Sequence, residues 1–154
     1  MPCHFSKSAD ETGRFSMTVI ETHSPAETEQ AGAALAERLS PGDVVGFTGA
    51  LGMGKTVFTR GLARGLGYDG DVTSPTFAII HEYRGGRVPL CHMDAYRLND
   101  AEDLFETGFY DYLDGGWIVA VEWNERVGVA PAVSVSIERV DDDTRRIRLE
   151  GRGF

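Results

Sequence analysis

Residues 49–56 constrain this chain more than any other segment. They read Gly49-Ala50-Leu51-Gly52-Met53-Gly54-Lys55-Thr56 and fit the pattern G-x-x-x-x-G-K-[ST]. Glycines let such a loop curl so that successive N–H groups point at a phosphate, and a following helix adds the positive end of its dipole. Lys55 would place an ammonium against the terminal phosphates, and the Thr56 hydroxyl would ligate Mg²⁺. The segment therefore predicts a loop that binds a nucleoside triphosphate.

The sequence on both sides of the loop supports this interpretation. Residues 43–48 are mostly apolar and predict a short buried strand. After the loop, apolar and small residues recur at helical spacing as far as Gly67, which provides a stop. A strand, a phosphate loop and a helix in this order are typical of an α/β fold with its ligand at the carboxyl end of the strand.

The charge of the chain argues against a large nucleic-acid surface. Its 15 basic and 24 acidic residues give a net charge of −9, whereas a protein that grips nucleic acid needs a basic surface. We therefore expect a partner to hold any nucleic acid. The 154 residues, 42% of them hydrophobic, suit one domain with a core of its own.

Neither the cysteines nor the apolar segments indicate an exported or membrane protein. Cys3 and Cys91 give no disulfide framework and no metal-ligand spacing, and Cys91 is predicted to be a buried thiol. No apolar stretch approaches the length of a membrane span, and the first 16 residues lack the apolar core of a secretory signal. The expected location is the cytoplasm, without membrane contact.

The N-terminal part of the chain divides into a tail and the start of the domain. Residues 1–16 are polar, and we interpret them as a disordered tail before a single domain at 17–154. Residues 17–21 predict a short strand. Residues 24–27, Ser-Pro-Ala-Glu, combine an N-cap, a proline at the first helical position and a glutamate three residues after the cap. They predict a helix that ends at Pro41-Gly42.

The rest of the chain predicts a mixed sheet. Two glycines at 85–86 lie between apolar runs and predict a β-hairpin, which departs from β-α-β alternation. Residues 99–113 predict one or two short helices, and residues 117–121 a central strand. Residues 133–137 and 146–149 alternate as antiparallel partners, the second at the sheet edge. We expect an α/β, three-layer fold like that of P-loop NTPases, with a mixed, mainly parallel central sheet and an antiparallel C-terminal strand pair.

Two carboxylates are the candidates for chemistry beside the loop. Asp94 follows the apolar run 88–93, and Glu122 follows the run 118–121. Metal-assisted hydrolysis of a phosphate needs a carboxylate on a neighbouring strand to hold Mg²⁺ and a group that orients the attacking water. Either acid alone could equally be a surface residue at a strand end. Beside a phosphate loop, we expect at least one of them in the site.

Two other groups of polar residues near these strands each have two possible interpretations. Arg97 either stabilises charge on the leaving phosphate or pairs with Asp94. The hydroxyls of residues 73–76 either sense the terminal phosphate as a switch loop or cap their own turn. Trp123 is interpreted as a packing or interface residue.

The nucleotide is expected to be ATP. The two lysines, Lys7 and Lys55, are not preceded by asparagine, so the guanine-reading motif N-K-x-D is absent. His81 and His92 lie within predicted strands, and we interpret both as structural and not as metal ligands.

The chain resembles the TsaE family in four segments, which read GALGMGKT, VTSPTF, HMDAYRL and AVEWNER. Members of this family are slow bacterial ATPases needed to make threonylcarbamoyladenosine in transfer RNA. They act on the TsaD–TsaB complex, in which TsaD performs the carbamoyl transfer, and their nucleotide cycle resets that complex between turnovers. The resemblance implies ATP and Mg²⁺ as cofactors, TsaD–TsaB as partner, and contact with tRNA only through the complex.

The resemblance also implies a role for each matching residue. Thr56 and Glu122 would ligate Mg²⁺, Asp94 would be the acid needed for hydrolysis, and residues 73–76 would be a switch loop. Lys55, Asp94 and Glu122 would be the catalytic residues. The ATP phosphates would be bound by Leu51, Gly52, Met53, Gly54, Lys55 and Thr56.

The chain departs from the usual family pattern at three positions. The loop of the family commonly reads G-D-L-G-A-G-K-T, whereas Ala50 and Met53 stand here. Asn124 replaces a common proline and is expected to loosen the turn after Glu122. None of the three changes removes a catalytic group.

Three hypotheses of function follow from these residues. The first is a Mg²⁺-dependent ATPase that acts as a cycling factor for a tRNA-modifying complex. The second is a small-molecule or nucleoside kinase, suggested by Asp94 and Arg97 after a strand. Against it, no arginine-rich lid is evident between Arg97 and Glu122. The third is an assembly switch in which nucleotide binding matters and turnover is incidental.

Overall fold

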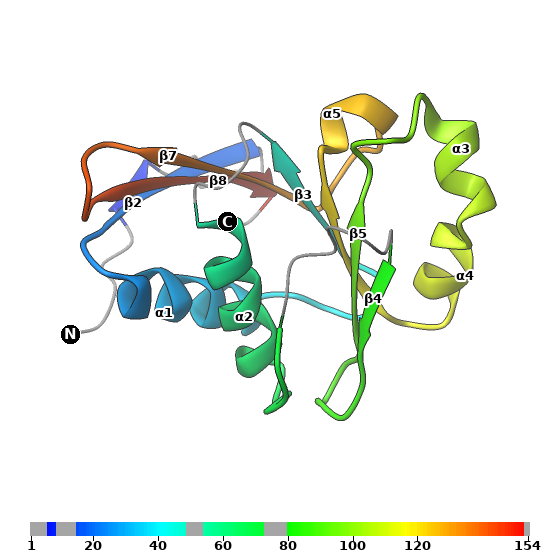
Figure 1. Ribbon diagram of the computed structural model, residues 1–154, viewed down its shortest axis with the longest axis horizontal. Coiled ribbons are helices and arrows are strands. Elements are labelled where there is room, and N and C mark those ends of the chain that lie inside the picture. Colours follow the sequence, from blue (N-terminus) through cyan, green and yellow to red (C-terminus); the bar gives the residue numbers. More distant parts are fainter. Residues whose placement is uncertain (1–5, 9–14, 49–53, 73–79, 153–154) are drawn as a thin grey trace.

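The computed structural model describes residues 6–8, 15–48, 54–72 and 80–152, which form one sheet with helices against both of its faces (Figure 1). The strands are β1 (Ser6–Ser8), β2 (Phe15–Thr22), β3 (Val44–Thr48), β4 (Ile80–Tyr83), β5 (Leu90–Asp94), β6 (Ile118–Glu122), β7 (Val133–Arg139) and β8 (Arg145–Arg152). The helices are α1 (Pro25–Ala36), α2 (Lys55–Gly65), α3 (Ala101–Glu106), α4 (Phe109–Asp114) and α5 (Asn124–Val127). Across the sheet the strands follow the order β1-β2-β8-β7-β3-β6-β5-β4.

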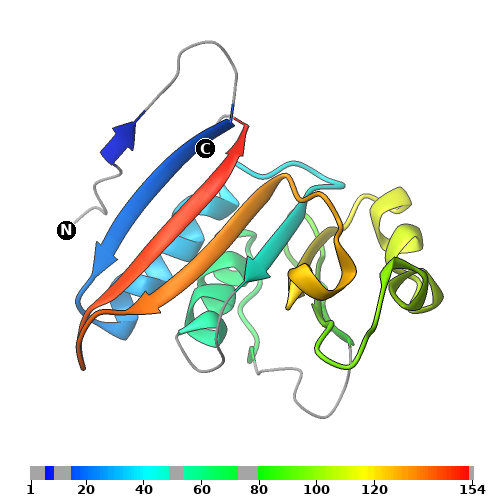
Figure 2. The ribbon, with the colours of Figure 1, turned by 90° about the horizontal axis from the view of Figure 1, so that it is seen from above.

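The predicted mixed sheet is confirmed, with its parallel part in the centre. Strand β3 pairs in parallel with both β6 and β7, and β5 pairs in parallel with β6. The outer pairs are antiparallel, including the C-terminal pair β7–β8 and the hairpin β4–β5. In Figure 2, β2, β8, β7 and β3 lie side by side with α1 and α2 beneath them.

Two predictions about the sheet's outer strands need correction. Within the segment 1–16, predicted as a disordered tail, residues 6–8 form β1, which pairs with β2, and β2 itself begins at Phe15. Residues 1–5 and 9–14 lie outside the described residues. Strand pairing uses backbone groups, so a polar composition does not prevent it. Strand β8, predicted at the edge, lies between β7 and β2, because β2 pairs with β8 along its whole length.

Side-chain alternation divides the core into two layers. On β3, Val45 and Phe47 belong to a first core under α1 and α2, whereas Val44 belongs to a second core with α3, α4 and α5. Strand β6 alternates likewise and is buried at every residue, as expected for a central strand covered on both faces. The three-layer arrangement is therefore confirmed.

Local sequence signals explain where the helices begin. Helix α1 starts after Ser24, whose side chain accepts a hydrogen bond from the Glu27 N–H, and Pro25 occupies the first turn, as predicted. In the acidic segment after β5, Asp100 caps α3 by accepting from the Asp103 N–H. Gly108, at φ 88°, separates α3 from α4, so the segment forms two short helices.

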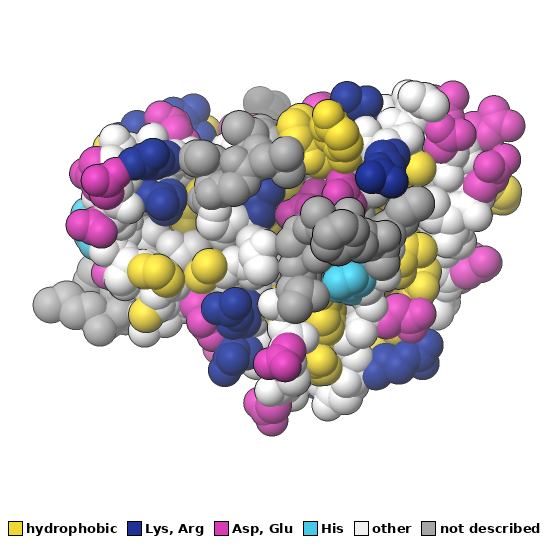
Figure 3. All heavy atoms as spheres, in the orientation of Figure 1, with side chains coloured by type: hydrophobic (Ala, Val, Ile, Leu, Met, Phe, Trp, Pro, Cys, Tyr) yellow, Lys and Arg dark blue, Asp and Glu magenta, His cyan; other side chains and the backbone are white. Residues whose placement is uncertain are grey.

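The surface over α3 and α4 is acidic (Figure 3). Glu102 and Asp103 lie in the first turn of α3, and Asp111 lies in the first turn of α4, where the helix dipoles favour negative charge. Across the part of the chain that the structure describes, no helix is both long and apolar enough to cross a membrane.

Helices α1 and α2 approach each other through glycines. A Cβ placed on Gly61 of α2 would lie 2.0 Å from the Glu29 carbonyl oxygen of α1. A Cβ on Gly32 of α1 would lie 2.2 Å from the Phe58 carbonyl oxygen of α2. Because α2 begins at Lys55, this close contact also positions the first turn of α2 at the end of β3.

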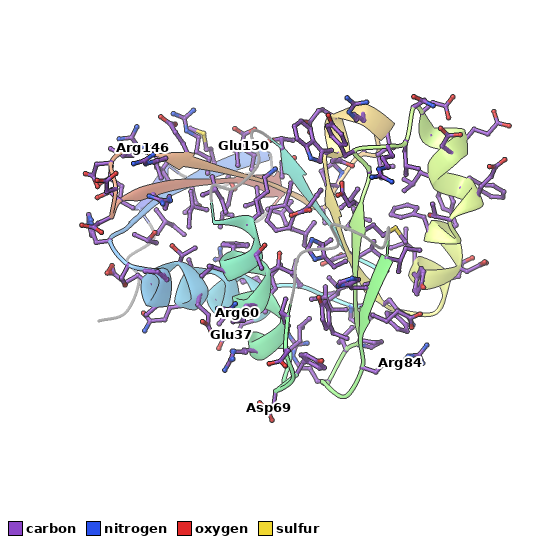
Figure 4. All side chains as sticks on the ribbon, in the orientation of Figure 1. Glu37, Arg60, Asp69, Arg84, Arg146 and Glu150 are labelled. Atoms are coloured by element: carbon purple, nitrogen blue, oxygen red, sulfur yellow. The ribbon has the colours of Figure 1, made fainter. Side chains whose placement is uncertain are left out.

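Replacing Gly61 by alanine should therefore destabilise the protein, although the same change within an exposed helix normally stabilises it. We expect Gly61→Ala to lower the free energy of unfolding in a urea titration by about 2–3 kcal/mol, because the backbone of α1 cannot move aside easily. The control is Arg60→Ala on the same helix, at a residue labelled in Figure 4. It should change the free energy by less than about 0.5 kcal/mol. Equal effects of the two substitutions would contradict the close contact.

Cys91 is buried in the second core, as predicted. Burial raises the pKa of its thiol to about 12, and the negative charge of Glu82 acts in the same direction. The thiolate is the nucleophile in alkylation, so the folded protein should hold this cysteine unreactive.

In the folded protein at pH 8, only about one Cys91 thiol in 10,000 should be ionised. We expect iodoacetamide to leave Cys91 unmodified in buffer and to label it fully in 6 M guanidinium chloride, as measured by mass spectrometry of peptides. Rapid labelling of Cys91 without denaturant would contradict its burial.

Candidate functional site

The two predicted carboxylates meet at one edge of the parallel strands. Asp94 ends β5 and Glu122 ends β6, and the two residues are register partners. The strand ends are tied further by the Ala95 N–H, which donates to the Glu122 carbonyl oxygen at 2.9 Å. One carboxylate oxygen of Asp94 accepts a 2.9 Å hydrogen bond from the Tyr96 N–H, which fixes its orientation.

The start of α2 faces the same edge. Gly54 precedes the helix with φ 99°, a conformation that glycine adopts without strain. Lys55 is the first helical residue and only 4% exposed, and Thr56 follows it half-buried. Part of the predicted phosphate loop lies outside the described residues, namely Leu51, Gly52 and Met53 together with Ala50, which differs from the common family pattern. Residues 73–76 lie outside them as well.

The site combines buried charges of opposite sign. Burial lowers the pKa of Lys55, although the carboxylates of Glu122, Glu125 and Asp94 act in the opposite direction. Burial alone would raise the pKa of Glu122, but the neighbouring His92 and the charge of Lys55 outweigh it and the pKa is lowered. Lys55 and Glu122 therefore each stabilise the charged form of the other, and both side chains are almost fully buried.

Trp123, predicted as a packing or interface residue, packs against the second core and also lies beside Lys55 of the candidate site. It is the one described residue other than glycine with a positive φ, at 60° with ψ 41°. The Lys55 Nζ lies 5.2 Å from the centre of its ring, and the centre of the Tyr96 ring lies 5.2 Å from the same point. The Arg126 guanidinium in turn lies 4.8 Å from the Tyr96 ring. Left-handed backbone is costly for a bulky residue such as tryptophan, and residues strained in this way cluster at functional sites.

Asn124 braces the turn after Glu122, contrary to the expectation that it loosens this turn. Its side-chain amide donates to the Val129 carbonyl oxygen at 2.9 Å, which closes the short helix α5. The same amide lies against Gly46 of β3, where a Cβ would approach it to 2.9 Å. A side-chain hydrogen bond thus replaces the rigidity that proline supplies.

His92, for which the sequence predicts a structural role, lies next to the candidate site. Its Nε2 lies 3.6 Å from Oε1 of Glu122, with both side chains buried. The available signal was alternation along the strand, since His92 stands two residues before Asp94 and therefore faces the same side. His81 is only half-buried and contacts the Tyr83 hydroxyl at 3.4 Å, in agreement with a structural role.

Arg97 does not pair with Asp94 in the structure, which removes one of its two interpretations. Its side chain is exposed, and among the described residues no ion pair joins it to Asp94. The exposed position leaves its other predicted role, on the leaving phosphate, a prediction.

The residues at this edge suit a Mg²⁺ ion that is bound together with a nucleotide better than a metal ion that is bound by protein ligands alone. In the described ranges, no group of three or more His, Cys, Asp or Glu side chains gathers closely enough to hold a metal. The candidate oxygen donors at this edge are the carboxylates of Glu122 and Asp94 and the Thr56 hydroxyl, all of them hard ligands. Mg²⁺ is typically bound by one or two carboxylates together with phosphate oxygens and water. A Mg²⁺ that arrives with a nucleotide therefore suits this donor set.

The fold and the site together define a P-loop-like α/β protein with carboxylates at the ends of its central parallel strands. Residues 22–147 match the family described as threonylcarbamoyl adenosine biosynthesis protein TsaE. The chain therefore belongs to the TsaE family, a family of tRNA threonylcarbamoyladenosine biosynthesis.

Individual relatives cover most of the chain. The tRNA threonylcarbamoyladenosine biosynthesis protein TsaE of Bacillus subtilis is 41% identical over 136 residues, which are 86% of this chain and 84% of the relative. That of Treponema pallidum is 39% identical over 131 residues, 83% of this chain and 96% of the relative. Among solved structures, Bacillus subtilis YdiB matches with a TM-score of 0.70 and 35% identity, over 91% of this chain and 88% of that one.

The strain at Trp123 can be measured by comparing two substitutions. Trp123→Gly should be more stable than Trp123→Ala by about 1 kcal/mol in a urea titration, because a left-handed backbone costs alanine about 1–2 kcal/mol and glycine nothing. The same pair at Tyr96, where φ is not positive, should show the usual order, with the glycine variant less stable. The same order at both positions would argue against strain at Trp123.

Proposed function

We propose that this chain is a Mg²⁺-dependent ATPase that binds ATP at residues 51–56 and works in the cytoplasm. The observation that carries the proposal is that Asp94 and Glu122 end neighbouring strands at one edge of the sheet. The buried Lys55 lies close enough to both carboxylates that their charges raise its pKa, which opposes the lowering by burial. A lysine, a hydroxyl and two carboxylates around one point are what hydrolysis of a nucleoside triphosphate requires.

Each residue has a role in the proposed reaction. The Lys55 ammonium and the loop N–H groups bind the terminal phosphates, with Leu51, Gly52, Met53 and Gly54 supplying the loop. Thr56 and Glu122 hold Mg²⁺, which neutralises charge on the phosphates. Asp94, held by the Tyr96 N–H, orients the attacking water. Trp123, whose ring centre lies 5.2 Å from the Lys55 Nζ, shields this ammonium from water.

The proposed task of hydrolysis is to reset the TsaD–TsaB carbamoyltransferase complex between turnovers. Family membership supports a role in this modification, and the net charge of −9 disfavours direct binding of RNA. The acidic surface over α3 and α4 would repel a phosphate backbone as well (Figure 3). Contact with tRNA is therefore proposed to occur only through the complex.

The experiment that tests this proposal measures ATP hydrolysis with and without purified TsaD–TsaB, in parallel with tRNA modification. We expect slow hydrolysis by the chain alone and a changed rate with the complex. If TsaD–TsaB does not change the rate of hydrolysis and this chain does not change the extent of tRNA modification, the cycling role is wrong. Transfer of phosphate to an added nucleoside instead of water would favour the kinase hypothesis.

Two substitutions separate an ATPase from an assembly switch. Lys55→Ala should abolish the rise in melting temperature that ATP and Mg²⁺ produce, because the phosphates lose their buried cation. Asp94→Ala should keep this rise but lower hydrolysis by about 100-fold or more and stop modification. The control is Glu106→Ala, at an exposed residue of α3, which should change neither. If Asp94→Ala supports normal modification, nucleotide binding alone is sufficient and the switch hypothesis holds.

A further inference from the structure

His92 is a fully buried polar residue that the proposed reaction does not yet use. Its side chain is 0% exposed. Over the part of the chain that the structure describes, neither of its ring nitrogens has a hydrogen-bond partner. A buried imidazole without a partner is destabilising, and an apolar residue would fill the same space without this cost. The position therefore calls for an explanation other than packing.

The parallel pairing of β5 and β6 aims His92 at the site. His92 is the register partner of Ala120, and Asp94 is the register partner of Glu122 two residues later. Cys91 and Met93, on either side of His92, point into the second core, so His92 points to the opposite face of the sheet. Asp94 and Glu122 share this face by the same alternation. His92 thus lies one strand across from Glu122 and further from the sheet edge.

The contact between His92 and Glu122 has the geometry of a supporting interaction. Nε2 lies 3.6 Å from Oε1, slightly longer than a hydrogen bond. Hydrogen bonds at catalytic sites are often long before the ligand binds and shorten in the complex. Residues that hydrogen-bond to a metal ligand fix its orientation, and their loss typically lowers metal affinity about 10–100-fold.

We propose that His92 is a positioning residue, which donates its Nε2–H to Oε1 of Glu122 and so turns the other carboxylate oxygen toward Mg²⁺. This inference rests on the proposed function, because it assigns Glu122 to the metal. A histidine at this place provides a donor from inside the core, where water cannot supply one. A carboxylate held in this way keeps one orientation while Lys55 is engaged with phosphate.

The test compares substitutions that keep or remove the donor. His92→Phe fills the space without an N–H, and His92→Gln keeps an N–H that can reach the carboxylate. His92→Leu repeats the comparison in a smaller volume if the phenylalanine variant does not fold. The matched control is His81→Phe, because His81 is the register partner of His92 on β4 but contacts Tyr83.

The measurement is the affinity of Mn²⁺ for the complex of the protein with AMP-PNP, a non-hydrolysable ATP analogue, determined by electron paramagnetic resonance. His92→Phe should weaken Mn²⁺ binding about 10–100-fold without lowering the melting temperature of the free protein. His92→Gln should restore most of the affinity, and His81→Phe should leave it unchanged.

A double-mutant cycle shows whether His92 acts through Glu122. In a Glu122→Gln background, His92→Phe should have no further effect on Mn²⁺ binding. Independent, additive losses would overturn the inference, and so would wild-type affinity in His92→Phe. If Glu122→Gln weakens binding and His92→Phe does not, the proposed function stands and this inference alone fails. If the wild-type protein with AMP-PNP binds no Mn²⁺, both are wrong.

Discussion

The site depends on the parallel register of β3, β6 and β5. Because parallel strands end at the same edge, pairing Asp94 with Glu122 brings two carboxylates together that are distant in sequence. The register also decides which face each side chain takes, and a slip of one residue would send Glu122 into the second core. The two apolar cores that pack against the two faces of β6 oppose such a slip. The packing of the core and the chemistry of the site are therefore set by the same pairing.

The second support of the site is the contact between α1 and α2. The glycines at 32 and 61 let the two helix backbones approach more closely than any side chain would permit. Helix α2 is thereby held under the sheet with Lys55 at its start, next to the ring of Trp123. The antiparallel strands β2 and β8 enlarge the sheet over α1 and α2, while Arg146 and Glu150 of β8 lie on the opposite, outer face (Figure 4).

Sequence reasoning succeeded where the signal was local. The Ser24 cap, the glycine hairpin at 85–86 and the strand-end acids each rest on a few adjacent residues whose conformational preferences are strong. It failed where a long-range pairing decided the outcome, as with β1 and with β8 inside the sheet. His92 was missed because its meaning depends on Glu122 of the next strand. The strained backbone of Trp123 has no sequence signal, since left-handed conformations are read from glycine or asparagine and not from tryptophan.

The contact between Gly46 and Asn124 has a consequence for how the chain can vary. The asparagine amide occupies the space that any Cβ at position 46 would need, and it also closes the turn that follows the metal-binding candidate Glu122. A larger residue at 46 would have to be accompanied by a smaller or differently shaped one at 124. These two positions should therefore change together among related chains, and a substitution in the middle of the sheet should shift the turn that follows Glu122.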